Sequence, residues 1–327
     1  MEPLKLKAAF QDYIWGGRRL REEYGKPCKL DRIAESWELS CHPDGLTEIV
    51  NGVNKGMTLK AYLEQDWKTL VGEGASGYSK FPVLIKLIDA CQDLSIQVHP
   101  DDRYARANEK GENGKVECWY VVDCEEGAAL AYGFNRELTR EEFESHINDG
   151  TLLDYIRLVP VHKGDVFFIE AGTIHAIGAG IVIAEIQETS NITYRVYDYE
   201  RVDADGNPRE LHIKKALDVT KTWAAPPRMK RPPMQYNGYT ATIIADCQYF
   251  STLELSIEGE AAFPPNGGLS YTHLLVTDGE GVLIYDDGVL MPLTKGDSVF
   301  LPANFGAYAI RSQKCTVLAT RTMPKRG

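Results

Sequence analysis

The chain has 327 residues, of which 43% are hydrophobic and 25% charged, as in ordinary globular proteins. This length suits two domains that each bury a core. The formal net charge of -11 argues against nucleic acid as the main partner, because polyanions bind to basic surfaces. A small anionic substrate, held by a few local cations, is compatible with this charge.

The cysteines and the N-terminus indicate a compartment. Seven cysteines are scattered along the chain without a C-x-x-C pair, which predicts reduced thiols and no thiolate zinc site. Residues 1–17 lack the apolar core of a secretory signal, and no run approaches the ~20 apolar residues of a membrane span. We therefore expect a cytoplasmic protein without a membrane partner.

The first two thirds of the chain predict a β body with a few helices. Leucines at helical spacing predict a helical segment over about 56–72. A capping box of Thr139 and Glu142 predicts a second over about 139–158. Between and after them lie apolar, strand-like runs, namely "PVLIKLIDA", "VECWYVVD", "DVFFIEA" and "GIVIAEIQ". The helices are expected to cover this β body.

A proline-rich stretch divides the chain. Residues 224–234, "AAPPRMKRPPM", contain four prolines, which disfavour both helix and central strand. They predict an interdomain linker. The short β-branched and aromatic runs after it predict a small all-β unit, with "DGEG" at 278–281 as a hairpin turn.

Two segments resemble each other. Residues 163–177, "KGDVFFIEAGTIHAI", and 295–310, "KGDSVFLPANFGAYAI", share an opening, an apolar strand, a turn and an ending. Either both are hairpins built by similar turn rules, or the chain contains two related β-barrels. The first copy has His175 where the second has Ala307 or Tyr308. If His175 binds a metal, the second barrel has lost its site.

Residues 94–102, "LSIQVHPDD", place three polar side chains on one face of a strand. Strand side chains alternate, so Ser95, Gln97 and His99 point away from their apolar neighbours. This face is either solvated or binds a ligand. In "KVECWYV", the same alternation places Lys115 and Glu117 on one face.

Four polar side chains from these strands and from the segment 163–177 form a candidate set of metal ligands. They are Gln97, His99, Glu117 and His175. Taken singly, each also fits a turn, a core or a salt bridge. Two imidazoles, a carboxylate and an amide oxygen suit zinc and leave positions for water or substrate.

Two further charged residues stand out downstream. Glu185 lies inside an apolar run, and burying a carboxylate is costly unless it is paired or functional. Arg195 lies in the next strand and can hold a phosphate or stabilise an oxyanion. The alternatives are an arginine partner for Glu185 and an exposed strand position for Arg195.

Six motifs in order closely resemble the type I mannose-6-phosphate isomerases, zinc-dependent members of the cupin superfamily, in their short bacterial form. The likeness covers roughly residues 8–220, and the part after the linker resembles a degenerate second cupin. The motifs are "DYIWGGRRL", "AESWELS", "FPVLIKLIDACQDLSIQVHPDD", "KVECWYVVD", "AGTIHAIGAGIVIAEIQETSNITYRVYDY" and "RELHIKKALDV".

The resemblance implies an all-β protein of two jelly-roll-like cupin barrels with a few covering helices in the N-terminal part. Residues 1–223 are expected to form the catalytic zinc domain, 224–234 the linker, and 235–327 a degenerate cupin without a metal site. The resemblance does not extend to an oligomeric state.

The resemblance also implies roles for the site residues. One Zn²⁺ per chain is expected on Gln97, His99, Glu117 and His175. Lys115, Glu185 and Arg195 are implied as catalytic residues, and Ser95, Lys115 and Arg195 as substrate-binding residues. Glu185 matches only if one spacer residue is allowed, and Val116 stands where many relatives carry proline.

The implied reaction interconverts mannose 6-phosphate and fructose 6-phosphate through an enediol-type proton transfer, with Glu185 or zinc-bound water as the base. One alternative is a different metal-dependent cupin, such as an iron oxygenase. Another is a non-catalytic, sugar-binding regulatory cupin, because a cupin fold alone implies no activity.

Overall fold

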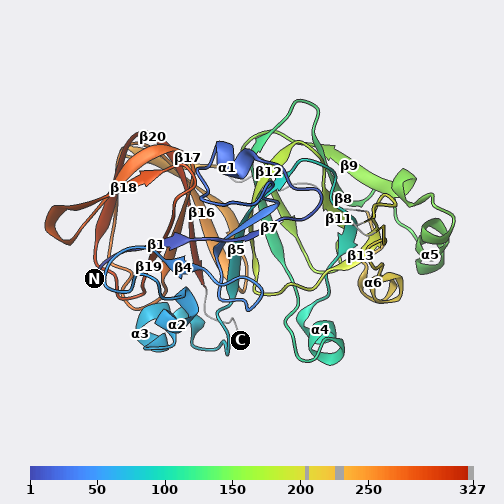
Figure 1. The fold of residues 1–327 in the computed structure, drawn as a ribbon, viewed down its shortest axis with the longest axis horizontal. Helices are drawn as coiled ribbons and strands as arrows, with labels where there is room; N and C mark the ends of the chain where they lie inside the picture. The colour runs from blue at the N-terminus through green and yellow to red at the C-terminus, as the bar shows by residue number, and fades with distance from the viewer. Residues whose placement is uncertain (203–205, 225–231, 323–327) are drawn as a thin grey trace. The chain divides into compact units, whose positions relative to one another are not determined.

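The computed structural model describes residues 1–202, 206–224 and 232–322. They form two compact units built mainly from antiparallel strands, which confirms the all-β class (Figure 1). Unit 1 comprises Met1–Gln11, Arg18–Leu87 and Lys230–Gly327, and unit 2 comprises Asp12–Gly17 and Ile88–Met229. These units divide the chain differently from the predicted domains 1–223 and 235–327, whose boundaries stay a prediction. Most of the predicted linker, 225–231, lies outside the described residues.

Within its described residues, unit 2 contains short strands and three α-helices. Its elements are β6 (Ile96–Val98), α4 (Asp102–Asn108), β7 (Glu117–Cys124), β8 (Ala129–Phe134), α5 (Arg140–Asn148), η2 (Leu152–Tyr155), β9 (Ile156–Pro160), β10 (Val166–Ile169), β11 (His175–Ile177), β12 (Ile181–Glu188), β13 (Tyr194–Tyr197) and α6 (Ile213–Val219). One sheet has the order β13-β6-β11-β8-β9, and β7 pairs with β10 and β12 on its two sides.

The helices of unit 2 pack on one face of the five-stranded sheet. Ile96 and Val98 of β6 share an apolar cluster with Phe143 of α5 and Ala216 of α6. Tyr104 of α4 packs against the same cluster. The alternation of β6 therefore leaves the opposite face of this sheet for Gln97, and the predicted role of helices as covers is confirmed (Figure 1).

Helix starts follow the predicted capping chemistry. Thr139 accepts a hydrogen bond from the backbone N–H of Glu142, whose side chain accepts one from the Thr139 N–H. This capping box begins α5, so the second predicted helical segment, about 139–158, is helical at its start. Its end is wrong, because α5 ends at Asn148 and strand β9 begins at Ile156 after the short 3-10 turn η2. Asp101 caps α4 by accepting from the N–H of Tyr104.

Unit 1 contains the long C-terminal strands together with N-terminal elements. Its elements are β1 (Leu4–Lys7), β2 (Ala9–Gln11), α1 (Arg19–Glu22), β3 (Glu35–Leu39), β4 (Glu48–Ile49), α2 (Leu59–Leu63), α3 (Trp67–Val71), η1 (Glu73–Ala75), β14 (Met234–Tyr236), β15 (Tyr239–Asp246), β16 (Phe250–Phe263), β17 (Thr272–Tyr285), η3 (Asp286–Gly288), β18 (Val289–Thr294), β19 (Ser298–Leu301) and β20 (Tyr308–Thr322). Strand β5 (Val83–Ala90) begins in unit 1 and ends in unit 2.

A nine-stranded sheet organises unit 1. Its order is β14-β15-β16-β20-β17-β19-β1-β4, with β18 paired to β17. Strand β1 comes from the N-terminus, so this sheet joins both ends of the chain. Its core is an apolar cluster that includes Leu255, Val276, Phe305 and Ile310.

The predicted hairpin turn at 278–281 is wrong. Strand β17 runs through this segment and pairs with β20 on both sides of it, with register shifts on either side. Gly279 adopts φ +73°, and a Cβ there would lie 2.2 Å from the carbonyl oxygen of Lys314. The glycine therefore makes an irregularity within a long strand. The chain reverses instead at Asp286–Gly288, between β17 and β18.

The predicted helical segment at 56–72 is present as two short helices. Thr58 caps α2, and Asp66 caps α3 by accepting from the N–H of Thr69. The second cap begins a new helix, so the leucine spacing spans a break.

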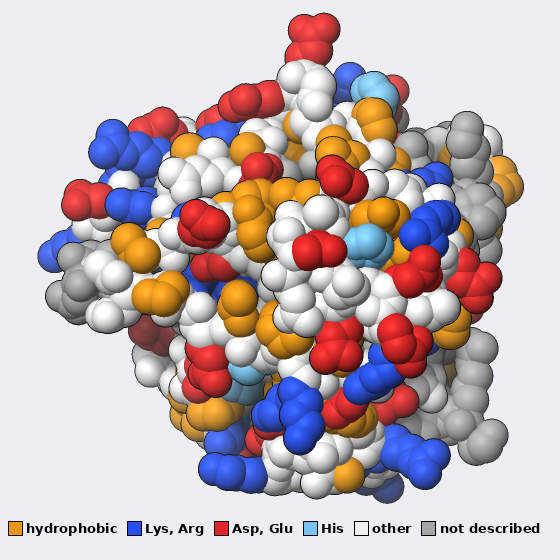
Figure 2. All heavy atoms as spheres, turned by 90° about the vertical axis from the view of Figure 1, so that its right-hand side faces the viewer, with side chains coloured by type: hydrophobic (Ala, Val, Ile, Leu, Met, Phe, Trp, Pro, Cys, Tyr) orange, Lys and Arg blue, Asp and Glu red, His pale blue; other side chains and the backbone are white. Residues whose placement is uncertain are grey.

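Figure 2 shows acidic and basic side chains interspersed with apolar ones on the face it presents.

Among the described residues, no helix combines the length and the hydropathy that a membrane crossing requires.

Candidate metal centre

The five-stranded sheet of unit 2 aligns three of the predicted site residues. In the pairing of β6 with β11, Gln97 lies opposite His175, and in the pairing with β13 it lies opposite Arg195. Directly opposed residues of antiparallel strands point to the same face. Arg195, Gln97 and His175 therefore form one row across three strands.

Strands β7 and β12 supply a second row. Glu117 lies opposite Gln187, and Trp119 lies opposite Glu185. These four side chains share one face, because each pair is directly opposed and the two pairs are two residues apart. Glu117, Glu185 and Gln187 are each at most 3% exposed, so this face is buried.

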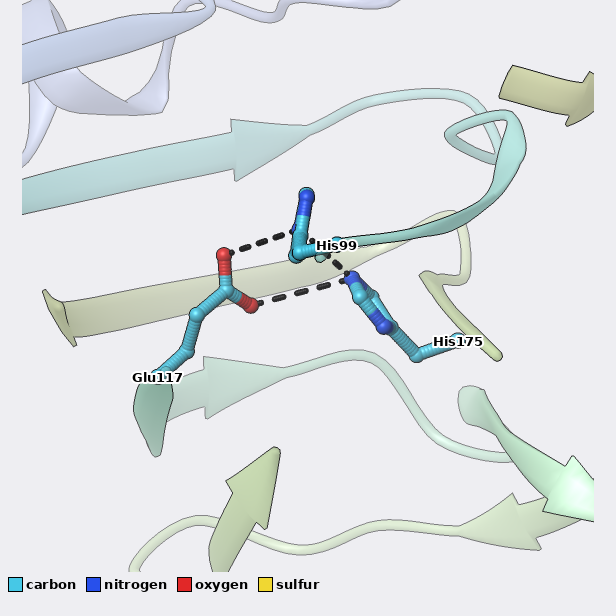
Figure 3. Close-up of side chains that lie close together, drawn as sticks. All are labelled: His99, Glu117 and His175. Carbon is cyan, nitrogen blue, oxygen red and sulfur yellow. Dashed lines mark hydrogen bonds and ion pairs between the residues drawn. The ribbon is translucent and has the colours of Figure 1, made fainter. Parts of the chain in front are cut away.

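His99, Glu117 and His175 converge in a buried cluster (Figure 3). The Nε2 atoms of the two imidazoles lie 3.1 Å apart. The Oε1 atom of Glu117 lies 3.2 Å from Nε2 of His99, and its Oε2 lies 3.7 Å from Nε2 of His175. The structure thus brings together three of the four predicted ligands, and all three are at most 1% exposed.

Backbone carbonyls fix the tautomer of both imidazoles. Nδ1 of His99 lies 2.8 Å from the carbonyl oxygen of Ile192, and Nδ1 of His175 lies 2.8 Å from that of Thr173. A carbonyl oxygen only accepts, so each Nδ1 carries the proton and donates it. The Nε2 lone pairs therefore face each other, an arrangement that calls for a shared cation.

The electrostatics of the cluster favour the protonation states that bind metals. Burial, together with the cation of Lys115, lowers the pKa of His99 to about 3. Burial also lowers the pKa of His175. Burial opposes ionisation of Glu117, but the cation of Lys115 outweighs it, so the pKa of this carboxyl lies well below its usual value. Neutral imidazoles and an ionised carboxylate are ready to act as ligands.

The spacing of the donor atoms fits a tetrahedral ion. Zinc bonds of about 2.0–2.1 Å to nitrogen imply donor separations of roughly 3.3–3.4 Å in a tetrahedron. The separations within the cluster, 3.1, 3.2 and 3.7 Å, bracket this value. The side-chain amide of Gln97 lies 3.4 Å from Nε2 of His175. Because its nitrogen and oxygen are interchangeable by a flip, the amide can offer oxygen as a fourth donor.

Lys115 is a buried cation within the same cluster. Its Nζ lies 2.7 Å from Oε1 of Glu117, and its side chain is 5% exposed. The backbone N–H of Lys115 donates to the carbonyl of Pro100, which holds the segment before β7. Lys115 thus places a positive charge beside the candidate metal ligands.

The guanidinium of Arg195 has one nitrogen that donates a hydrogen bond and another that has no partner in the described part of the chain. One Nη1 donates to the carbonyl of Glu210 at 2.7 Å, while the buried Nε has no hydrogen-bond partner among the described residues. Burial and the neighbouring Arg209 lower the pKa of Arg195, although an arginine remains charged at neutral pH. Ser95, the remaining predicted substrate residue, is buried directly before β6.

Glu185 is oriented by a residue that the sequence reasoning missed. The indole Nε1 of Trp119 donates to Oε2 of Glu185 at 2.9 Å. The same indole packs edge-on against His175, with ring centroids 5.2 Å apart and an interplanar angle of 81°. Continuing the alternation in "KVECWYV" by two residues from Glu117 would have placed Trp119 on the site face.

Comparison with known proteins places this chain in a family. A mannose-6-phosphate isomerase from Bacillus subtilis (strain 168) is 38% identical over 309 residues, which cover 94% of this chain and 96% of that protein. This chain belongs to the type I mannose-6-phosphate isomerase family. The family prediction is therefore confirmed.

Other relatives of this family agree in sequence and in fold. The family model for the catalytic domain of type I phosphomannose isomerase matches residues 4–122, and the model for the mannose-6-phosphate isomerase cupin domain matches residues 240–321. A mannose-6-phosphate isomerase from Streptococcus mutans is 37% identical over 92% of both chains. The crystal structure of the mannose 6-phosphate isomerase from Bacillus subtilis matches with a TM-score of 0.91 and 36% identity, over 98% of this chain and 99% of that one.

Proposed function

We propose that this chain interconverts mannose 6-phosphate and fructose 6-phosphate, with one zinc ion held by Gln97, His99, Glu117 and His175. The observation that carries the metal assignment is the pair of imidazole lone pairs that face each other at 3.1 Å beside a buried carboxylate. Relatives that match nearly the whole chain are mannose-6-phosphate isomerases, which supports this substrate.

The reaction moves a carbonyl between C1 and C2 of the sugar. A proton must leave C2 of the aldose and be delivered to C1, while the hydroxyl proton on O2 passes to O1, by way of an enediol-type intermediate. Bound zinc supplies Lewis-acid polarisation of the sugar oxygens, which is worth several kcal/mol. We assign the proton transfer to Glu185, because the indole of Trp119 holds one of its carboxylate oxygens in place. Proton transfer by a positioned side chain contributes about 10²–10⁴-fold.

Cations and a hydroxyl bind the substrate in this proposal. Lys115 and Arg195 attract the phosphate or steady the negative charge that develops on the sugar oxygen. The free Nε of Arg195 offers a donor that no described residue uses. Ser95 contributes a hydroxyl from the position directly before β6. Local cations of this kind explain how an acidic chain accepts an anionic sugar.

We further propose that the enzyme works in the cytoplasm. Its seven cysteines carry free thiols within the described residues. Free thiols at this number suit a reducing compartment.

A coupled assay with mannose 6-phosphate tests the proposal. We expect fructose 6-phosphate to form, turnover to stop after treatment with a chelator, and zinc to restore it. Turnover that resists chelation while no metal is bound would refute the metal assignment. Sugar phosphate binding without turnover would favour a non-catalytic protein, and oxygen consumption would favour a metal-dependent oxygenase.

A matched pair of variants tests the role of Glu185. Glu185→Gln keeps the shape and the hydrogen bond from Trp119 but removes the base, so we expect kcat to fall about 10²–10⁴-fold with zinc content unchanged. Glu125→Gln, a glutamate-to-glutamine change at an exposed position, serves as the control. A Glu185→Gln enzyme with normal kcat would assign the proton transfer to another group.

A further inference from the structure

The two imidazoles of the metal centre are held in different ways. His175 donates from Nδ1 to the carbonyl of Thr173, two residues earlier in the chain. His99 donates to the carbonyl of Ile192, 93 residues away. Ile192 lies in the segment 189–193, which joins β12 to β13 without regular structure. The orientation of His99 therefore depends on how this segment is held.

Gln187 holds the near end of the segment. Its side-chain amide donates to the carbonyls of Glu188 at 2.8 Å and Ser190 at 2.7 Å. Both partners are carbonyl oxygens, so the group that faces them is the NH₂ and both of its hydrogens are used. The Gln187 side chain is fully buried, and water therefore does not replace these bonds.

Ser190 holds the middle of the segment. Its hydroxyl donates to the carbonyl of Asn113 at 3.0 Å and accepts a hydrogen bond from the N–H of Ile192 at 3.3 Å. Ser190 is 1% exposed. The backbone N–H of Ile192 is thus held by Ser190, while the backbone carbonyl of Ile192 accepts the hydrogen bond from Nδ1 of His99.

We propose that Gln187 and Ser190 are positioning residues that orient His99 for metal binding by fixing the carbonyl of Ile192. The inference rests on the proposed zinc site. A partner of a ligating histidine sets the direction in which its other nitrogen points, and loss of such a partner typically lowers metal affinity 10–100-fold. Here the partner is a backbone carbonyl in an irregular segment, so the side chains that hold the segment carry that role.

Zinc titration of three variants tests the inference. Gln187→Met keeps the length of the side chain without its donors, and Ser190→Ala removes only a hydroxyl. Thr189→Val is the matched control, because the buried Thr189 hydroxyl has no hydrogen-bond partner within the described segments. Metal-free protein is titrated with Zn²⁺ alone against a chromophoric chelator. We expect the Kd to rise about 10–100-fold in Gln187→Met and Ser190→Ala and to stay unchanged in Thr189→Val.

The visible absorption of bound Co²⁺ reports on ligand geometry, and a general loss of stability does not change it. With Co²⁺ at saturation, we expect the visible absorption of Gln187→Met and Ser190→Ala to differ from wild type, because the His99 ring is differently oriented, while Thr189→Val matches wild type. If wild type binds zinc and both folded variants bind it equally well, the inference is overturned. If wild type itself binds no zinc, the proposed function fails instead. Should Gln187→Met not fold, the inference is tested by comparing the zinc Kd of Ser190→Ala with that of Thr189→Val.

Discussion

The face of the unit 2 strands that carries the candidate metal centre and the core of the unit 1 sheet are both buried, but they bury different kinds of side chain. In unit 2, strands β7 and β11 place Glu117 and His175 together, each without measurable exposure. In unit 1, the core of the nine-stranded sheet is an apolar cluster around Val276, Phe305 and Ile310. Burying charge is costly unless each group is paired, whereas burying apolar side chains is the main source of stability. We infer that unit 2 gives up stability for a reactive site and that the unit 1 core contributes mainly stability.

The repeated segments show where the two interiors diverge. In 163–177, strand β10 is followed by β11, which begins at His175, and in 295–310, strand β19 is followed by β20, which begins at Tyr308. Tyr308 belongs to the apolar cluster and stacks on Phe263 with ring centroids 5.0 Å apart. The first residue of the second strand is thus a candidate metal ligand in one unit and a core aromatic in the other.

The largest effect is expected from removing a candidate ligand. His99→Ala takes one imidazole out of the metal centre, so we expect stoichiometric zinc to be lost and kcat/KM to fall by roughly 10³-fold or more, the equivalent of several kcal/mol. Metal analysis and the coupled assay measure both. His162→Ala, a change at a histidine whose side chain is 85% exposed, should behave as wild type. A His99→Ala protein that keeps its zinc would show that the ligand set is wrong.

A core substitution in unit 1 should affect stability and leave the metal centre unchanged. Phe305 is 1% exposed within the apolar cluster, so Phe305→Ala should cost about 3–5 kcal/mol of unfolding free energy. Urea unfolding measures the loss, and zinc content at low temperature should remain stoichiometric. Ile310→Val, in the same cluster, provides a milder companion with an expected cost of about 0.5–1.5 kcal/mol. Loss of zinc from folded Phe305→Ala would contradict the division of roles.

Removing the metal should destabilise unit 2, in contrast to the core substitution in unit 1. A ligand that binds only the folded state at 100 times its Kd stabilises that state by about 2.7 kcal/mol, so chelation should lower the unfolding free energy by a similar amount. Amide hydrogen exchange should accelerate in β6, β7 and β11 and stay unchanged in β16 and β20. Faster exchange that is spread equally over both sets of strands would argue against a metal site confined to unit 2.

The smallest expected effect concerns a buried histidine in unit 1. Nε2 of His273 lies 2.8 Å from the hydroxyl of Ser298, which donates to the carbonyl of Glu38. Burial, together with the cation of Lys26, lowers the pKa of His273 from 6.5 to about 3. Between these values the unfolded chain binds more protons than the folded protein. The stability from this group is therefore complete above pH 6.5 and is lost as the pH falls toward 3.

His273→Gln removes this titration and so tests it. The unfolding free energy of wild type should fall more steeply with acid than that of the variant, by up to about 1.4 kcal/mol per pH unit. Urea unfolding at several pH values below 6.5 gives both slopes. Equal slopes in the two proteins would show that His273 is not held neutral.

The sequence predicts those parts of the site that depend on strand alternation. Gln97 and His99 follow from a period of two, and Glu117 follows from the same rule in the next polar strand. Trp119 obeys that rule as well, but an indole in an apolar run usually indicates core packing. The carbonyl of Ile192 leaves no trace in the sequence, because every residue has a carbonyl and only the fold decides which one meets His99.

The errors in the fold have equally local causes. Gly279 within "DGEG" is typical of a turn, yet the pairing of β17 with β20 keeps the strand continuous, because long-range hydrogen bonds outweigh local turn preference. Asp66 begins a second helix inside a leucine pattern that fits one. The pairing of β1 with β19 joins residues almost 300 positions apart, and no local pattern encodes such a partner.

The edge-on contact between Trp119 and His175 gives the protein an internal optical reporter. An indole whose centroid lies 5.2 Å from that of a candidate ligand ring is close enough for its fluorescence to be quenched by a paramagnetic ion such as Co²⁺ at that ligand. Occupancy of the site can therefore be followed in unlabelled protein by emission alone, and Trp119→Phe identifies the part of the signal that originates there.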